Sequence, residues 1–127
     1  MIEALRKRII TLSSFPENAV QTYSIPDSLD QSIGVFSYGE NPGNPEYEVF
    51  QGRYQIQCRA GKYDSGPAKE TAYALACALR SSLETGMDEL DGKKVFITLE
   101  RPGVRFLKYD GASRPVYFFQ IALEGQE

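Results

Sequence analysis

The chain has 127 residues, of which 42% are hydrophobic and 24% charged, a composition typical of a single globular domain. Its formal net charge of -3 disfavours a generally basic nucleic-acid-binding protein. No apolar run approaches the roughly 20 residues that span a bilayer, so we expect no membrane association. The chain has no histidine, which excludes Ser-His-Asp and Cys-His catalytic sites and the common histidine-containing zinc sites.

The first half of the chain contains one predicted helix and one predicted strand. Apolar residues recur at steps of three and four over residues 2–12, which predicts an amphipathic helix that Pro16 ends. After a polar connection, β-branched and aromatic residues predict a short strand over 33–38. Residues 39–48 are rich in proline, glycine and asparagine, so we expect a surface loop there.

The second half begins with the clearest periodic pattern of the sequence. Apolar and polar residues alternate strictly over 50–60, which predicts a strand with one buried face, typical of an antiparallel sheet. An alanine-rich apolar stripe predicts a helix that starts at Pro67 and stops before Gly86. Alternating apolar residues predict two further strands, over 94–100 and 115–124.

The order helix, strand, strand, helix, strand, strand predicts one α+β domain over residues 1–127. Two main helices should pack on one face of an antiparallel sheet of about four strands. The acidic residues 88–92 lack the alternating oxygen ligands of a calcium loop, so we interpret them as a polar turn before a strand. Residues 101–114 form a connection that is long for a hairpin, and long ordered loops tend to carry function.

Groups that could support catalysis are scarce in this sequence. Cys58 and Cys77 have no CxxC spacing and no histidine partner, so we interpret both as free, buried, small side chains. We find no glycine-rich phosphate-binding loop. The prediction is therefore a protein that is not an enzyme, without catalytic residues, cofactor site or metal site.

Charge is distributed unevenly along the chain. No lysine or arginine occurs from Ile9 to Gly52, whereas residues 93–114 contain six. Opposite charges on separate segments favour head-to-tail contact between copies, and exposed tyrosine and arginine are frequent interface anchors. The predicted acidic interface segment comprises Glu40, Glu46, Tyr47 and Glu48, and the basic one comprises Arg101, Arg105, Phe106, Lys108, Tyr109 and Arg114.

Three other interpretations of these two segments stay open. The charges could be a solvated surface that clusters by chance. The aromatic residues could fold back onto their own domain. The basic segment could also contact nucleic-acid phosphates, which would give weak binding without sequence preference.

A series of short motifs extends over residues 2–124. It comprises IGVFSYG at 33–39, a Pro/Gly loop, QIQCR at 55–59, an alanine-rich helix from Pro67, ERP at 100–102 and DG at 110–111. In this order the motifs resemble the minor capsid and tail terminator proteins of long-tailed bacteriophages. The family has no common catalytic or binding residues, so the site prediction rests on charge and loop composition.

The resemblance implies a structural protein that forms a hexameric ring at the head-proximal end of the tail tube. In that family the ring stops polymerisation of the tube protein, offers a surface to head-completion proteins and lets DNA pass through its channel. The implied partners are further copies of the chain, the tube protein and a head-completion protein. The implied location is the virion tail, after assembly in the host cytoplasm. The alternatives are another head–tail neck component and a small, non-specific nucleic-acid-binding module.

Overall fold

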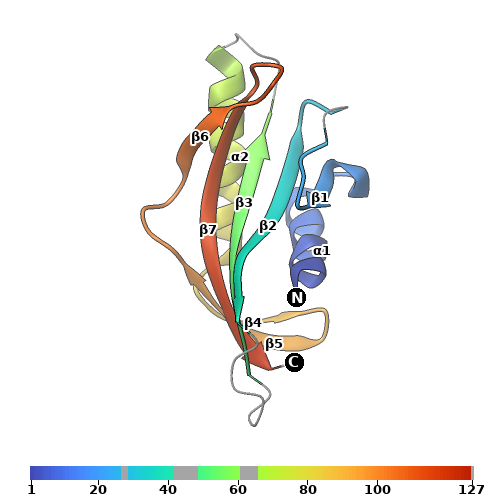
Figure 1. Cartoon of the computed structure of the whole chain (residues 1–127), viewed down its shortest axis with the longest axis vertical. Coiled ribbons are helices and arrows are strands. Elements are labelled where there is room, and N and C mark those ends of the chain that lie inside the picture. The colour runs from blue at the N-terminus through green and yellow to red at the C-terminus, as the bar shows by residue number, and fades with distance from the viewer. Residues whose placement is uncertain (27–28, 42–48, 61–65, 127) are drawn as a thin grey trace.

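The computed structural model describes residues 1–26, 29–41, 49–60 and 66–126. This part of the chain forms two α-helices, one short 3-10 helix and seven strands, and the strands join in one sheet (Figure 1). The helical elements are α1 (Ile2–Ser13), the short 3-10 helix η1 (Glu17–Ala19) and α2 (Gly66–Leu83). The strands are β1 (Val20–Thr22), β2 (Ser32–Asn41), β3 (Val49–Arg59), β4 (Gly86–Leu90), β5 (Lys93–Leu99), β6 (Arg105–Tyr109) and β7 (Pro115–Gln126).

The sheet is centred on the long strand β7. Its order is β1-β2-β3-β7-β5-β4, and β6 also pairs with β7. Along one side β7 pairs with β3, while on its other side β6 pairs with residues 115–118 and β5 with residues 121–125. The β1–β2 pair is parallel and the others are antiparallel. The sheet is therefore mixed.

The predicted sheet of about four antiparallel strands is wrong, although the mixed α+β class holds. The strands that the sequence analysis missed are β1, β4 and β6, which lie at edges of the sheet. Strand β1 is only three residues long, and β4 and β6 are short and carry charged residues, so none of the three shows the apolar alternation that identifies a half-buried strand. Residues 88–90, which were predicted as part of a polar turn, belong to β4.

Asp91 and Gly92 form the tight turn that joins β4 to β5. Their φ angles are 50° and 80°, and Leu90 pairs directly with Lys93 across the turn. Two consecutive residues with positive φ match the type I′ turn, whose twist suits a two-residue hairpin. The Asp-Gly turn before a strand is thus confirmed, two residues long.

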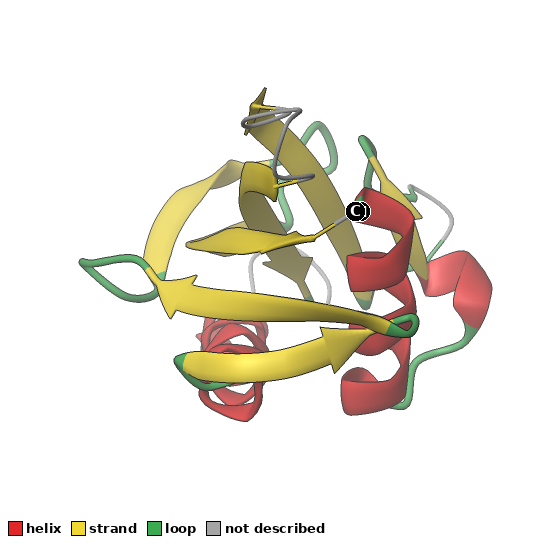
Figure 2. Cartoon of the chain, turned by 90° about the horizontal axis from the view of Figure 1, so that it is seen from below, coloured by secondary structure: helices red, strands yellow, loops and turns green. Residues whose placement is uncertain are grey.

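Both long helices pack on the same face of the sheet, which curves around them (Figure 2). The alternation predicted for β3 is confirmed from Gln51 to Cys58, because Tyr54, Ile56 and Cys58 are fully buried while Gln51 and Arg53 are exposed. Arg59 departs from it, because this charged residue is buried as well. The buried apolar side chains join residues of α1, α2 and β7 in one core. Cys58 is therefore a core residue as expected, whereas Cys77 is only half-buried.

Helix α1 lies between two edge strands of the curved sheet, β1 and β4, and forms hydrogen bonds with both. Arg6 donates to the carbonyl oxygen of Val20 in β1 at 2.6 Å. Arg8 forms a 2.6 Å ion pair with Asp88 and also donates to the carbonyl oxygen of Glu89, both in β4. Two edge strands thus have main-chain acceptors bound by arginines of the same helix.

Candidate interface

The predicted acidic segment is placed only in part. The backbone of Glu40 lies in β2, where it pairs with Gly52 of β3. Glu46, Tyr47 and Glu48 lie outside the described residues. The acidic segment therefore stays a prediction from the sequence.

The predicted basic segment is organised around an edge strand rather than as a loop. Residues 105–109 form β6, whose only strand neighbour among the described residues is β7. Arg101, Arg105 and Lys108 are exposed, and Arg105 also lies over the ring of Phe118 at 4.6 Å. The structure thus presents these basic side chains along one side of the sheet.

The aromatic residues of β6 extend over the neighbouring helix. Phe106 packs edge-to-face against Tyr109 at 5.2 Å and against Tyr117 at 5.5 Å, and Tyr117 contacts Tyr73 of α2 at 5.6 Å. The ammonium group of Lys69 lies 5.4 Å from the Tyr109 ring. We call these five residues the aromatic edge.

The aromatic edge combines packing within the domain with exposure to solvent. Tyr73, Phe106 and Tyr109 are 49%, 44% and 48% exposed. Each of these rings packs against another ring of the aromatic edge and still offers about half of its surface to a partner. Tyrosine and arginine positioned in this way are common anchors of protein interfaces.

Three residues of the aromatic edge, Lys69, Tyr73 and Tyr117, were not among the predicted interface residues. Lys69 and Tyr73 are four residues apart on α2, which places them on one face of that helix, and this spacing was readable from the sequence. Their proximity to β6 was not, because it depends on how α2 crosses β7.

Arg59 is the largest fully buried side chain among the described residues. It lies on the face of the sheet opposite the two helices. It forms a 3.0 Å ion pair with Asp110. It also donates to the carbonyl oxygens of Pro26, Leu29 and Asp30. These bonds tie the segment before β2 to the turn that follows β6.

Arg114 belongs to the same buried cluster. Its guanidinium binds Asp110 at 2.9 Å and Asp30 at 3.3 Å, and the residue is only 7% exposed. Its side chain is thus buried and paired within the subunit, whereas Arg105 and Lys108 are exposed. We call Asp30, Arg59, Asp110 and Arg114 the arginine–aspartate cluster.

The carboxyl groups of Asp88 and Asp110 are both stabilised in their charged form. Partial burial raises the pKa of Asp110, but hydrogen bonds from Arg114 and the Ala112 amide outweigh it, so the net pKa is lowered. Partial burial also raises the pKa of Asp88, but hydrogen bonds from the Glu89 amide and from Arg8 outweigh this effect, so the net pKa is lowered.

These lowered pKa values predict acid-sensitive stability. A carboxyl group whose pKa is lower in the folded state stabilises the fold above its unfolded pKa, and this contribution is lost as the pH falls through the folded value. We expect the free energy of unfolding to decrease below about pH 4, the range of an ordinary aspartate. Urea titrations from pH 7 down to about pH 3 measure this, and Asp110→Asn should reduce the slope. An equal slope in that variant would contradict the role of Asp110.

A polar group of three residues bridges strands on the face opposite the helices. The Tyr38 hydroxyl donates to Glu100 at 2.9 Å, and Arg53 lies 3.6 Å from the same carboxylate. Partial burial and this hydrogen bond raise the pKa of Tyr38 to about 12. The tyrosine is therefore a neutral donor that fixes Glu100 beside the end of β5.

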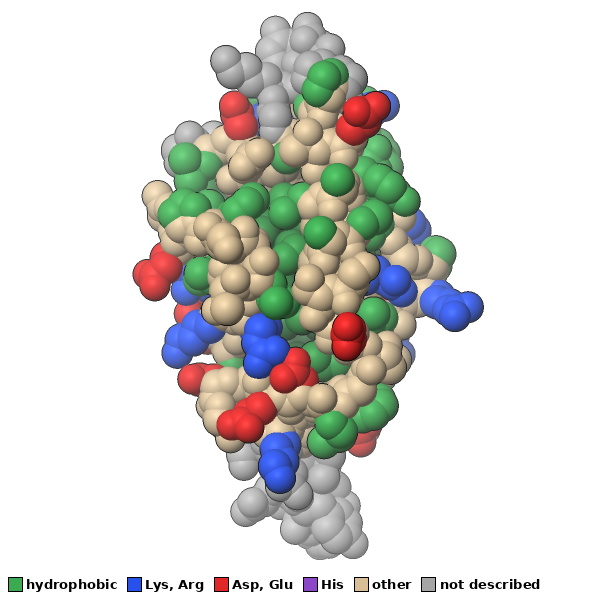
Figure 3. All heavy atoms as spheres, turned by 180° about the vertical axis from the view of Figure 1, so that it is seen from behind, with side chains coloured by type: hydrophobic (Ala, Val, Ile, Leu, Met, Phe, Trp, Pro, Cys, Tyr) green, Lys and Arg blue, Asp and Glu red, His purple; other side chains and the backbone are tan. Residues whose placement is uncertain are grey.

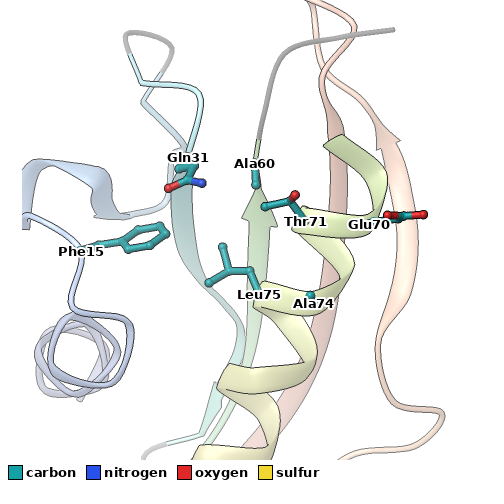
Figure 4. Close-up of a pocket in the computed structure, with 7 residues that line it drawn as sticks. All are labelled: Phe15, Gln31, Ala60, Glu70, Thr71, Ala74 and Leu75. Atoms are coloured by element: carbon teal, nitrogen blue, oxygen red, sulfur yellow. The ribbon is translucent and has the colours of Figure 1, made fainter. Parts of the chain in front are cut away.

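An apolar groove of about 530 Å³ opens between α2 and the segment that follows α1. Phe15 and Leu75 face each other across it (Figure 4). Its other lining residues are Gln31, Ala60, Glu70, Thr71 and Ala74. On this side of the molecule hydrophobic side chains gather around a hollow, and charged side chains cluster below it (Figure 3).

A smaller polar hollow of about 320 Å³ lies beside the arginine–aspartate cluster, and its lining includes Arg59, Lys108 and Asp110. Arg59 and Asp110 are paired with each other there. Among the described residues no group of three or more cysteine, aspartate or glutamate side chains is placed to hold a metal ion. Within the same part of the chain, neither helix has the length and apolar character needed to cross a membrane.

Comparison with known proteins identifies the fold but no family. No protein-family model and no curated protein matches the sequence. Among solved structures, 26 chains match. One of them, whose name states no function, is 13% identical, with a TM-score of 0.60 over 98% of this chain and 92% of its own. At this identity the likeness shows that the chain shares the fold of that protein.

Proposed function

We propose that the protein is a structural assembly protein of a long-tailed bacteriophage, a tail terminator that forms a ring on the tail tube. Such a protein must bind copies of itself sideways and must present two unlike ends, one to the tube and one to the head-completion protein. The sequence motifs described above support this role. The proposed partners are therefore the tube protein, the head-completion protein and further copies of the chain.

The observation that carries this proposal is the position of two connections at opposite ends of one sheet. In the β3–β7 register Val49 pairs with Gln126 at one end, and Arg59 pairs with Val116 at the other. Strand β2 ends and strand β3 begins at the first of these ends, and the sequence between the two strands is acidic. The connection from β6 to β7 lies at the other end, which holds the arginine–aspartate cluster. Unlike ends suit a ring that joins two different partners along its axis.

The two sides of the sheet also differ from each other. One side ends in β1, whose Val20 carbonyl is bound by Arg6, and the other side is formed by β6 with the aromatic edge and, further along β7, by β5 and β4. Contact between unlike surfaces repeats from copy to copy, and it closes into a ring when the rotation between copies permits. A closed ring leaves no lateral site free, which limits growth in its plane.

Polymerisation of tail tubes in vitro tests the proposed function. The tube protein encoded by the same genome is assembled with and without this protein, and tube lengths are measured by electron microscopy. We expect shorter tubes that carry one added ring at a single end. Unchanged lengths without bound protein would contradict the proposal. Binding to portal complexes instead would favour another neck component, and steeply salt-dependent DNA binding would favour a nucleic-acid-binding module.

A further inference from the structure

We infer that the β6 side of one copy docks on the η1–β1 side of a second copy, head to tail. This inference rests on the proposed ring and specifies which two surfaces form its seam. The first surface is Arg105 and Lys108 together with the aromatic edge. The second is the side of the sheet formed by η1, β1 and the turn after β1.

The first surface is basic and rich in exposed rings. Arg105 and Lys108 are exposed on β6, and Lys69 is exposed beside them on α2. Lysine is charged at neutral pH at its ordinary pKa, and a hydrogen bond with Tyr109 raises the pKa of Lys69 further. Half-exposed rings that are already fixed by their neighbours lose little conformational freedom on binding.

The second surface has the complementary charge. It belongs to the stretch from Ile9 to Gly52 that contains no lysine or arginine. Glu17 of η1 is exposed, and Tyr23 after β1 is 58% exposed. The nearest arginine, Arg6, is engaged by Glu3 and by the carbonyl oxygens of Glu17 and Val20. The exposed charge of this side is therefore acidic.

The sheet places these surfaces at opposite edges (Figure 1). At the level of Ile33 the strands follow the order β1, β2, β3, β7, β6, because Val20, Ile33, Cys58 and Tyr117 pair in succession. Phe106 of β6 then pairs with Tyr117. A copy docked on one edge therefore leaves its own opposite edge free for the next copy. A two-fold contact through β6 would instead bring the basic side chains of two copies together, which charge repulsion opposes.

Pairs of variants that each carry one added cysteine, beside the buried Cys58, test the polarity of the seam. In a Cys77→Ala background, Lys108→Cys is mixed with Glu17→Cys under oxidising conditions, and crosslinked dimers are measured by mass spectrometry. We expect crosslinking in the mixture and little with either variant alone. The matched control replaces Lys93, an exposed lysine on β5, by cysteine. Crosslinking of Lys108→Cys with itself, or of the control to the same extent as the mixture, would overturn the inference.

Charge reversal tests the same seam independently of crosslinking. We expect Arg105→Glu combined with Lys108→Glu to weaken self-association at least tenfold at low salt, with partial recovery when Glu17→Lys is added to the same chain. Lys93→Glu combined with Lys94→Glu makes the same change in net charge and should have little effect. Sedimentation velocity measures association, and circular dichroism verifies folding.

The outcomes separate this inference from the proposed function. If the variant with charge reversal at Arg105 and Lys108 still forms rings like those of the wild type, the proposed seam is refuted and the proposed ring is not. A wild-type protein that neither associates nor binds tube ends would refute both. Loss of association in the reversal variant, with its partial recovery, supports the seam.

Discussion

Asp110→Asn is expected to lower the free energy of unfolding by about 3–5 kcal/mol, the range for removing one partner of a buried ion pair. Asp110 is bound by Arg59 and Arg114, whose side chains are 2% and 9% exposed. Without the carboxylate, Arg59 and Arg114 lose the charged partner that they share, while Arg114 keeps its ion pair with Asp30, whose side chain is 43% exposed. Asparagine retains one oxygen acceptor for the Ala112 and Arg114 amides, so the substitution removes mainly the charge.

Urea denaturation of the wild type and the variant measures this loss. Asp91→Asn is the matched control, because Asp91 forms an exposed ion pair with Lys7 at 3.5 Å. An exposed pair contributes about 0–1 kcal/mol, so the control should unfold nearly like the wild type. A loss of less than about 1 kcal/mol for Asp110→Asn would contradict the structural role of the cluster.

Phe119→Ala should also cost about 3–5 kcal/mol, because it leaves a cavity in the core. Phe119 is fully buried on β7, where it pairs with Ile56 of β3 and faces the helices. The cavity would open at the strand to which β3, β5 and β6 are all attached.

Thermal and urea unfolding measure the effect of Phe119→Ala against that of Phe96→Ala. Phe96 lies on β5 and is 42% exposed, so truncating it removes the same atoms from a half-solvated position. We expect a loss of about 1 kcal/mol or less for Phe96→Ala. Equal losses in the two variants would contradict the assignment of β7 as the centre of the core.

The sequence predicted the elements that bury several apolar residues at regular spacing and missed the short edge strands, which bury one apolar residue or none. Helices α1 and α2 and strands β2, β3, β5 and β7 carry apolar residues at regular spacing, because each buries one side against the core. Strands β1, β4 and β6 each pair through the main chain with one neighbouring strand. Such pairing leaves little trace in the side-chain pattern, and the parallel β1–β2 pair has no local sequence signal at all.

The candidate interface shows the same limit. The basic and aromatic content of residues 101–114 was visible in the sequence, and so was the charge asymmetry. Their division between surface and interior was not. Arg59 and Arg114 are buried beside Asp110. This burial could not be predicted, because Asp110 lies 51 residues from Arg59 in sequence and meets it only in the folded chain. Lys69 and Tyr73 join the aromatic edge through the packing of α2 on β7.

Imaging of tube ends in the presence of the purified protein tests the central claim most directly. End-on class averages should show a closed ring with rotational symmetry at one end of each tube. Each β6 side should face the η1–β1 side of the next subunit. Tubes without a ring at either end, or protein that continues as an open filament, would contradict the account.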